Sequence, residues 1–396
     1  MHNDRFDSLP PSPFATRLPR LLQGLNPPAE MRPIDMSIGE PRHAVPAMVR
    51  AELVAHLDTL NAYPSTIGTP ALRQAIAGFL ERRYSLPAGT IDPDTQVLPL
   101  SGTREGLFMA ALAAVPERKS GTKPAVLIPN PLYYCYVGAA VAAGAEPVLL
   151  PATQQTGFLP DYLGLPEAIL ARTAMAYLCS PANPQGAVAG PAYLARLIDL
   201  ARRHDFILAV DECYSEIYPD TPPPGVLEVC RDLGGCANVI TFNSLSKRSN
   251  VAGLRSGFVA GDPAFIRRFT HLRNYGATAM PTAVVAASTA LWKDDEHVRE
   301  NRALYRAKFD LAERLLAGRF GFYRPAGGFF LWLDVGDGEA ATRRLWAEAA
   351  VKVVPGAYLA LDDPHFGNPG KPYIRVALVH DMATTAEALA RIAKLA

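Results

Sequence analysis

Short hydrophobic runs alternate with longer amphipathic segments over residues 101–262. The runs are rich in aliphatic and β-branched residues, which is typical of buried strands, and the segments between them repeat apolar residues at helical spacing. Strands are predicted at residues 124–130, 146–152, 174–181, 206–212, 238–244 and 256–262, and helices at residues 104–115, 133–145 and 191–205. This alternation predicts an α/β fold, in which a largely parallel sheet is covered by helices on both faces.

The pattern changes after residue 281. A long charged helix is predicted first, and short strands and helices follow in mixed order, so we expect a smaller α+β domain in this part of the chain. The proline-rich first 45 residues are expected to form an arm and the beginning of the same small domain. The predicted division is therefore 1–46 for the arm and the start of the small domain, 47–281 for the large domain and 282–396 for the small C-terminal domain.

Composition excludes several classes of protein. Hydrophobic residues make up 49% of the chain and charged residues 19%, so the chain can fold around a buried core. The net charge is +1, from 39 basic and 38 acidic residues, which argues against nucleic-acid binding because such proteins usually carry a clear basic excess. The N-terminus does not resemble a signal or transit peptide, and every apolar run is far shorter than the ~20 residues of a membrane span.

The five cysteines are odd in number and widely spaced, without a CxxC pair or a neighbouring histidine cluster. They are Cys135, Cys179, Cys213, Cys230 and Cys236. We expect reduced thiols, which favours a cytoplasmic protein without a metal site. A catalytic cysteine is a weaker interpretation, because none has an evident base nearby in the sequence.

Polar residues follow the predicted strands at the ends where ligands bind in an open parallel sheet. They are Asn183, Asp211, Tyr214, Ser244, Ser246 and Lys247, and Gly102 and Thr103 precede the first predicted helix. An amide, a carboxylate, a phenol, hydroxyl groups and a lysine are thus expected on one rim of the sheet.

Pyridoxal phosphate requires a set of this kind. Its aldehyde condenses with a lysine of lowered pKa, for which Lys247 is the candidate. Its ring nitrogen needs a carboxylate such as Asp211, and its 3′-oxygen needs donors such as Asn183 and Tyr214. Its phosphate needs helix N-terminal amides, hydroxyl groups and a guanidinium group. The candidates for the phosphate are Gly102, Thr103, Ser244, Ser246 and Arg255.

Each of these residues also has an ordinary structural explanation. A lysine in a serine-rich loop is usually a solvated surface residue, and an aspartate at the end of a strand is more often a cap or turn residue. The SGT stretch at 101–103 could be only a helix N-cap. Their order and spacing along one chain are harder to explain by coincidence, so the cofactor site is the favoured interpretation.

Nine motifs together resemble the class I/II aminotransferases of the aspartate aminotransferase fold type. They are MSIGEP, NAYPSTIGTPALRQAIAGF, SGTREGLF, PNPLYYCY, SPANPQGAV, DECYSEIY, SLSKRSNVAGLRSGFVAGD, PAGGFFLWLDV and YIRVALV. They follow the family's order over nearly the whole chain, and SLSK followed by GLR is the most specific. The resemblance implies a large pyridoxal-phosphate-binding domain with a mostly parallel sheet and a smaller α+β domain.

The resemblance also assigns roles around the cofactor. Lys247 would bond covalently to the cofactor and shuttle a proton, and Asp211 would pair with the pyridinium. Asn183 and Tyr214 would bond the 3′-oxygen, and Tyr133 would stack on the ring, although Tyr133 could also be a core aromatic residue. The phosphate would be held by Gly102, Thr103, Ser244, Ser246 and Arg255.

Further roles concern the substrate and a second subunit. Arg375 would grip the substrate α-carboxylate, with help from Gly39 and Asn183. Tyr63 would reach the phosphate in the neighbouring subunit, which implies a homodimer with shared active sites. The chain departs from the family pattern at Gln185 and at Cys213, neither of which is expected to touch the chemistry.

Within the family, the motif wording is most similar to the N-succinyldiaminopimelate aminotransferases of bacterial lysine biosynthesis. Such enzymes use glutamate and 2-oxoglutarate, and a distal substrate carboxylate would need a second cation, for which Arg42 and Arg104 are candidates. Either arginine could equally be a surface residue. Three alternatives remain: a broad-specificity alanine, aromatic or aspartate-type aminotransferase, a β-lyase with the same cofactor, and a non-enzymatic binding module of this fold.

Overall fold

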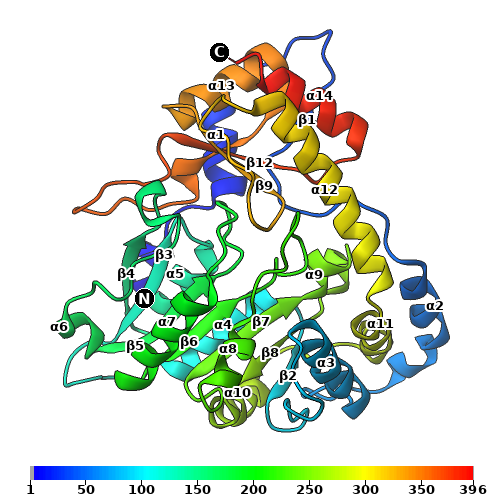
Figure 1. Cartoon of the computed structure of the whole chain (residues 1–396), viewed down its shortest axis with the longest axis vertical. Coiled ribbons are helices and arrows are strands. Elements are labelled where there is room, and N and C mark those ends of the chain that lie inside the picture. The colour runs from blue at the N-terminus through cyan, green and yellow to red at the C-terminus, as the bar shows by residue number, and fades with distance from the viewer. Residues whose placement is uncertain (1–3, 396) are drawn as a thin grey trace.

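A seven-stranded sheet forms the middle layer of the larger part of the molecule, in the lower half of Figure 1. The computed structural model describes residues 4–395. The strand order is β2-β8-β7-β6-β5-β3-β4. The strands are β2 (Val97–Leu100), β3 (Ala125–Asn130), β4 (Glu146–Pro151), β5 (Thr173–Cys179), β6 (Ile207–Asp211), β7 (Val239–Ser244) and β8 (Gly257–Gly261). Only β8 runs antiparallel to its neighbours, so the predicted largely parallel sheet is confirmed.

Helices cover both faces of this sheet, as predicted. Alternate residues of a strand point to opposite faces: in β6, Leu208 and Val210 pack in one core, and Ala209 packs in the other. The helices over the first core are α3 (Pro70–Arg83), α7 (Pro191–Arg203), α8 (Val226–Asp232) and α11 (Thr282–Lys293). Those over the second are α4 (Thr103–Ala114), α5 (Tyr134–Ala142) and α10 (Pro263–Gly276).

A smaller α+β unit lies at one end of the molecule, at the top of Figure 1. Its antiparallel sheet has the order β11-β12-β9, and a separate parallel pair joins β1 to β10. The strands are β1 (Ile34–Asp35), β9 (Phe330–Asp334), β10 (Val351–Lys352), β11 (Val354–Pro355) and β12 (Tyr373–Ala377), and the helices are α12 (Glu296–Leu316), α13 (Gly338–Ala349) and α14 (Met382–Ile392). This mixture confirms the fold class expected from the sequence.

The N-terminal arm packs on the same smaller unit. Its short helices are η2 (Pro13–Arg17) and α1 (Leu18–Leu22). Leu18 is buried against Trp332 and Val354. α11 packs against α2 (Ala47–Ala55) and α3, beside the large sheet. The division of the chain at residues 46 and 281 stays a prediction.

Three further findings concern the sequence-based expectations. Within residues 4–395, no helix is long and apolar enough to cross a membrane. The same residues contain no group of histidine, cysteine or acidic side chains that could hold a metal ion. All five cysteines are free.

Candidate active site

Adjacent strand ends bring the predicted lysine and aspartate together. Asp211 is the last residue of β6, which pairs with β7. β7 ends at Ser244, whose hydroxyl accepts a hydrogen bond from the amide of Ser246 at 3.1 Å and so caps the short helix α9 (Leu245–Arg248). α9 carries Lys247, whose charge acts on Asp211 across the rim.

Lys247 is held by the N-terminal segment of the chain. Its Nζ donates a hydrogen bond to the carbonyl of Gly39 at 2.7 Å, and it lies 5.5 Å from the centre of the Phe329 ring. Burial lowers the pKa of Lys247 to about 8, and the guanidinium groups of Arg375 and Arg255 act in the same direction. At pH 7 about a tenth of the amine is therefore unprotonated and nucleophilic, far more than for an ordinary lysine.

Asp211 is a buried carboxylate, with 6% of its surface exposed. Tyr136 donates its hydroxyl to Oδ2 at 2.8 Å, and the amide of Cys213 donates to Oδ1 at 3.2 Å. Burial raises the pKa of Asp211, because these donors and Lys247 offset only part of the desolvation. Among residues 4–395 the structure records no ion pair for this carboxylate, so the site favours a cation beside it.

Arg375, Asn183 and Tyr214, all predicted site residues, form one chain of hydrogen bonds. It lies in β12 and donates to Asn183 Oδ1 at 3.2 Å and to the carbonyl of Ser37 at 2.7 Å. Asn183 in turn donates to the hydroxyl of Tyr214 at 3.4 Å. Burial lowers the pKa of Arg375 to about 10, so the group is still charged at neutral pH. The ring of Phe330 lies 4.3 Å from its guanidinium carbon.

The beginning of α4 forms a cradle with Arg255. Gly102 has φ +88°, and a Cβ at this position would overlap the guanidinium of Arg255. Thr103 follows at the first turn of α4, where unpaired backbone amides can bind an anion. Ser244 and Ser246 are buried nearby on α9 and its cap. Close packing of Arg255 against a glycine therefore leaves no room for a larger residue at 102.

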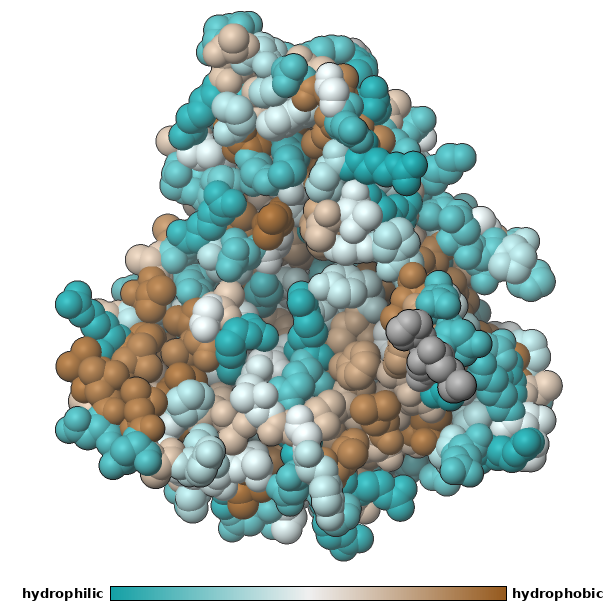
Figure 2. Space-filling model, turned by 180° about the vertical axis from the view of Figure 1, so that it is seen from behind, coloured by the Kyte–Doolittle hydropathy of each residue, from teal (hydrophilic) through white to brown (hydrophobic). Residues whose placement is uncertain are grey.

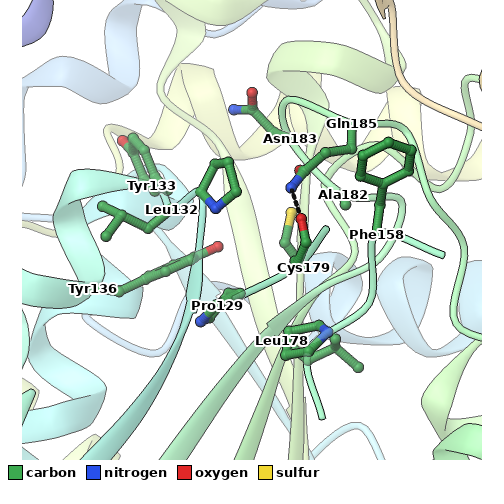
Figure 3. Close-up of a pocket in the computed structure, with 13 residues that line it drawn as sticks. Pro129, Leu132, Tyr133, Tyr136, Phe158, Leu178, Cys179, Ala182, Asn183 and Gln185 are labelled. Carbon is green, nitrogen blue, oxygen red and sulfur yellow. Dashed lines mark hydrogen bonds between the residues drawn. The ribbon is translucent and has the colours of Figure 1, made fainter. Parts of the chain in front are cut away.

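The two departures from the family pattern lie closer to the site than expected. The backbone amide of Cys213 donates a hydrogen bond to Asp211, and its sulfur lies 3.3 Å from the Thr103 hydroxyl, so Cys213 contacts two of the candidate site residues. Gln185 is buried and donates to the carbonyl of Ala152 at 3.3 Å (Figure 3). Gln185 also lines the small cavity beside Asn183.

Tyr133 lies at the other side of a small cavity that Asn183 and Gln185 also line (Figure 3). Its hydroxyl accepts a hydrogen bond from Arg104 Nε, and its ring meets Tyr136 edge-on at 5.6 Å. The cavity has a volume of about 10 Å³, enough for about one water molecule. Tyr133 is therefore fixed at the site by Arg104.

Two other candidates lie apart from this group. Tyr63 is fully exposed and makes no recorded contact with the rim in the described chain. Arg42 is exposed, and its guanidinium lies 3.3 Å from Nδ1 of His380. A role for Tyr63 therefore requires a second copy of the chain.

The chain matches known proteins over nearly its whole length. The aminotransferase class I and II family matches residues 32–392. The chain belongs to this family. An LL-diaminopimelate aminotransferase of Nitratidesulfovibrio vulgaris is 32% identical to the enzyme over 406 residues, which cover 99% of this chain and 98% of that protein.

Solved structures give the same result. The crystal structure of an aminotransferase from Neisseria meningitidis is similar to the enzyme with a TM-score of 0.93 and 42% identity, over 99% of both chains. A probable N-succinyldiaminopimelate aminotransferase from Thermus thermophilus has a TM-score of 0.80 and 28% identity, over 94% of this chain and 96% of its own. The expected family, fold and cofactor, pyridoxal phosphate, are thereby confirmed.

The side chains of the aminotransferase fit this cofactor. A protonated pyridine nitrogen would supply the cation that the buried Asp211 lacks. The cradle of Gly102 and Arg255 at the beginning of α4 suits a phosphate. Lys247 has the lowered pKa that condensation with an aldehyde requires.

Several site residues were not found from the sequence. Tyr136 orients Asp211, and Ser37 contributes the carbonyl that holds Arg375. Phe14 of the arm lies 5.4 Å from the guanidinium carbon of Arg375. Tyr136 belongs to the PNPLYYCY motif, so the sequence placed it close to the predicted site. Nothing local to Phe14 indicates its neighbour 361 residues later in the chain.

The lowered pKa of Lys247 makes a direct prediction about its reactivity. In cofactor-free protein, labelling by a small amine reagent should rise with pH and level off above about pH 9, because the amine with pKa about 8 is then neutral. Peptide mass spectrometry would follow the rate, with the exposed Lys293 as reference. A rate for Lys247 that keeps rising in parallel with Lys293 up to pH 10 would contradict the assigned shift.

Proposed function

We propose that the enzyme is an N-succinyldiaminopimelate aminotransferase of lysine and diaminopimelate biosynthesis, with glutamate and 2-oxoglutarate as the second substrate pair. The observation that supports the transamination chemistry is that Lys247 and Arg375 bind the same backbone segment. Lys247 donates a hydrogen bond to the carbonyl of Gly39, and Arg375 donates one to the carbonyl of Ser37. The sequences of the motifs and the name of the Thermus protein support the succinylated substrate. The name of the Nitratidesulfovibrio protein favours LL-diaminopimelate as the second candidate.

The rim residues would hold the cofactor in this proposal. Asp211 would keep the ring nitrogen protonated, and Asn183 and Tyr214 would donate to or share a proton with the 3′-oxygen. Tyr133, which Arg104 fixes, would stack on the ring. The phosphate would be bound by Gly102, Thr103, Ser244, Ser246 and Arg255. When bound, pyridoxal phosphate supplies an electron sink for the electrons released at the substrate Cα.

Lys247 and Arg375 would divide the work on the substrate. Neutral Nζ of Lys247 would take the proton from the substrate Cα, which a pKa of about 8 permits near neutral pH. Arg375 would bind the α-carboxylate through two parallel hydrogen bonds, because its Nε has no partner in the structure while its charge is buried. Tyr214, through Asn183, connects this clamp to the cofactor site.

The distal carboxylate of a long substrate would need a second cation. Arg104 and Arg42 are the proposed contacts, and the structure favours Arg104 because it lies against Tyr133 and Tyr134 at the site. Arg42 instead faces His380. A β-lyase would use the same lysine and aspartate, so the reaction type is decided by assay.

The substrate is tested by steady-state assay. With 2-oxoglutarate as acceptor, N-succinyl-LL-2,6-diaminopimelate should be turned over with the highest kcat/KM of a panel that includes LL-diaminopimelate, an aromatic, a branched, an alanine and an aspartate donor. Best turnover of LL-diaminopimelate would select the second candidate. Turnover of only an aromatic or branched amino acid would reject both, and pyruvate and ammonia from cystathionine would indicate the lyase.

Arg375→Ala should lower kcat/KM by about 30- to 5000-fold, because loss of one partner of a buried charge pair costs about 2–5 kcal/mol. Arg375→Lys keeps the charge but loses the planar fork, so its loss should be intermediate. Arg32→Ala is the control, since Arg32 is exposed and its recorded side-chain partners are Glu387 and Thr384 of α14, neither of which is a site residue. If Arg375→Ala stayed within a factor of two of the unchanged enzyme, this residue would not be the carboxylate clamp.

A homodimer with shared active sites is also proposed. Figure 2 shows apolar side chains gathered at its lower left, where α2 and η3 (Leu57–Asn61) lie. Exposed Val54, Leu57 and Leu60 belong to these elements, and exposed Tyr63 follows directly. An apolar surface next to a tyrosine for which no side-chain partner is recorded within residues 4–395 favours a second copy of the chain. A cytoplasmic location stays a prediction.

Sedimentation of the purified enzyme should show a dimer, and Leu57→Glu/Leu60→Glu should shift it toward monomer with loss of activity. Tyr63→Phe should leave the dimer intact but weaken the affinity for pyridoxal phosphate, because one hydroxyl contact to the phosphate is removed. Arg314→Glu on the exposed side of α12, in the smaller unit, serves as a surface control. A fully active monomer, or an unchanged cofactor affinity in Tyr63→Phe, would contradict shared sites.

A further inference from the structure

One extended segment, residues 36–43, connects both substrate-handling cations of the site. The carbonyl of Ser37 accepts from Arg375, and two residues later the carbonyl of Gly39 accepts from Lys247. A side chain at Gly39 would collide with the ring of Phe330, so the backbone passes close against β9. The position of this segment therefore sets the direction of two charged side chains at once.

The far end of the segment is fixed by His43. Its Nδ1 lies 2.7 Å from Asn301 Oδ1, and its Nε2 lies 2.6 Å from Nζ of Lys308. Both partners are on α12, and the imidazole also packs on the ring of Tyr305 at 4.6 Å. Lys308 is 1% exposed and makes its other recorded hydrogen bond to the carbonyl of Leu378, three residues beyond Arg375.

The hydrogen-bond directions in this cluster are determined by Asn301. Its Nδ2 donates toward the carbonyls of Lys247 and Arg248 at 3.5 and 3.4 Å, so its Oδ1 is the acceptor that faces His43. His43 must then carry its proton on Nδ1, which leaves the lone pair of Nε2 for Lys308. Asn301 thus connects His43 to the backbone of the helix that carries Lys247.

The charges around the cluster agree with a neutral imidazole. Burial lowers the pKa of His43 below its ordinary value and lowers the pKa of Lys308 to about 8. The cation of Lys308 also acts on His43, and the carboxylate of Asp381, the N-cap of α14, acts on Lys308. Protonation of His43 would turn an accepting nitrogen into a second donor toward an ammonium group.

We propose that His43 is a positioning residue of the aminotransferase: held between Asn301 and Lys308, it fixes the 36–43 segment so that the carbonyls of Ser37 and Gly39 orient Arg375 and Lys247. The inference rests on the proposed roles of Arg375 and Lys247. It adds a group that touches neither substrate nor cofactor, and it ties α9, α12 and β12 to one loop.

The test compares His43→Phe with the double variant His43→Phe/Lys308→Met. Phenylalanine keeps an aromatic ring beside Tyr305 but removes both hydrogen bonds and leaves Lys308 buried with fewer partners, so the melting temperature should fall. Replacement of both partners by apolar groups should restore most of that stability. In both variants KM for the amino donor and for the oxo acid should rise about tenfold, because the carboxylate clamp is misoriented.

The KM separates positioning from simple destabilisation, because a smaller folded fraction lowers the apparent kcat and leaves KM unchanged. His365→Phe is the control and should alter neither constant, because His365 is exposed and lies on none of the elements of the site or of the proposed dimer surface. A double variant with a restored melting temperature and an unchanged KM would overturn the proposal. If Arg375→Ala had no effect on KM, the proposed clamp itself would fail; if Arg375→Ala raised KM and His43→Phe did not, only the positioning role would fail.

Discussion

Incomplete compensation of buried charge is the constraint on which this structure depends. Asp211, Lys247 and Arg375 are all largely buried. Burial raises the pKa of the carboxyl group and lowers the pKa of the two cations, so it favours the neutral form of each. Backbone carbonyls, two amides and one phenol make some of their hydrogen bonds, but within residues 4–395 none of the three has a recorded ion pair. A cofactor with a cationic ring nitrogen and a substrate with a carboxylate would supply what Asp211 and Arg375 lack.

The two parts of the fold are both needed for this arrangement. The large sheet ends in Asp211 and presents the helix of Lys247, whereas Arg375 comes from the smaller sheet. The segment around Gly39 lies between them, and its carbonyls accept hydrogen bonds from both sides. The chain therefore assembles the site from three regions that are far apart in sequence, and the contacts of His43 with α12 hold the third region in register.

Local signals explain what the sequence could predict. Residues that follow strand ends, such as Lys247 and Asp211, are found because a parallel sheet collects its strand ends on one rim. The four-residue edge strand β2, which contains Pro99, escaped detection because its pattern is too short and proline is atypical of a strand interior. Contacts such as His43 with Lys308 join positions 265 residues apart and leave no local pattern.

Reduction with borohydride tests the central claim most directly. The enzyme loaded with pyridoxal phosphate is treated with borohydride, digested and mapped by mass spectrometry, so that the amine bonded to the cofactor is identified. The account predicts a single phosphopyridoxyl group, carried by Lys247 at close to one per chain. Modification at another lysine, or no fixed cofactor in an enzyme that still transfers amino groups, would contradict it.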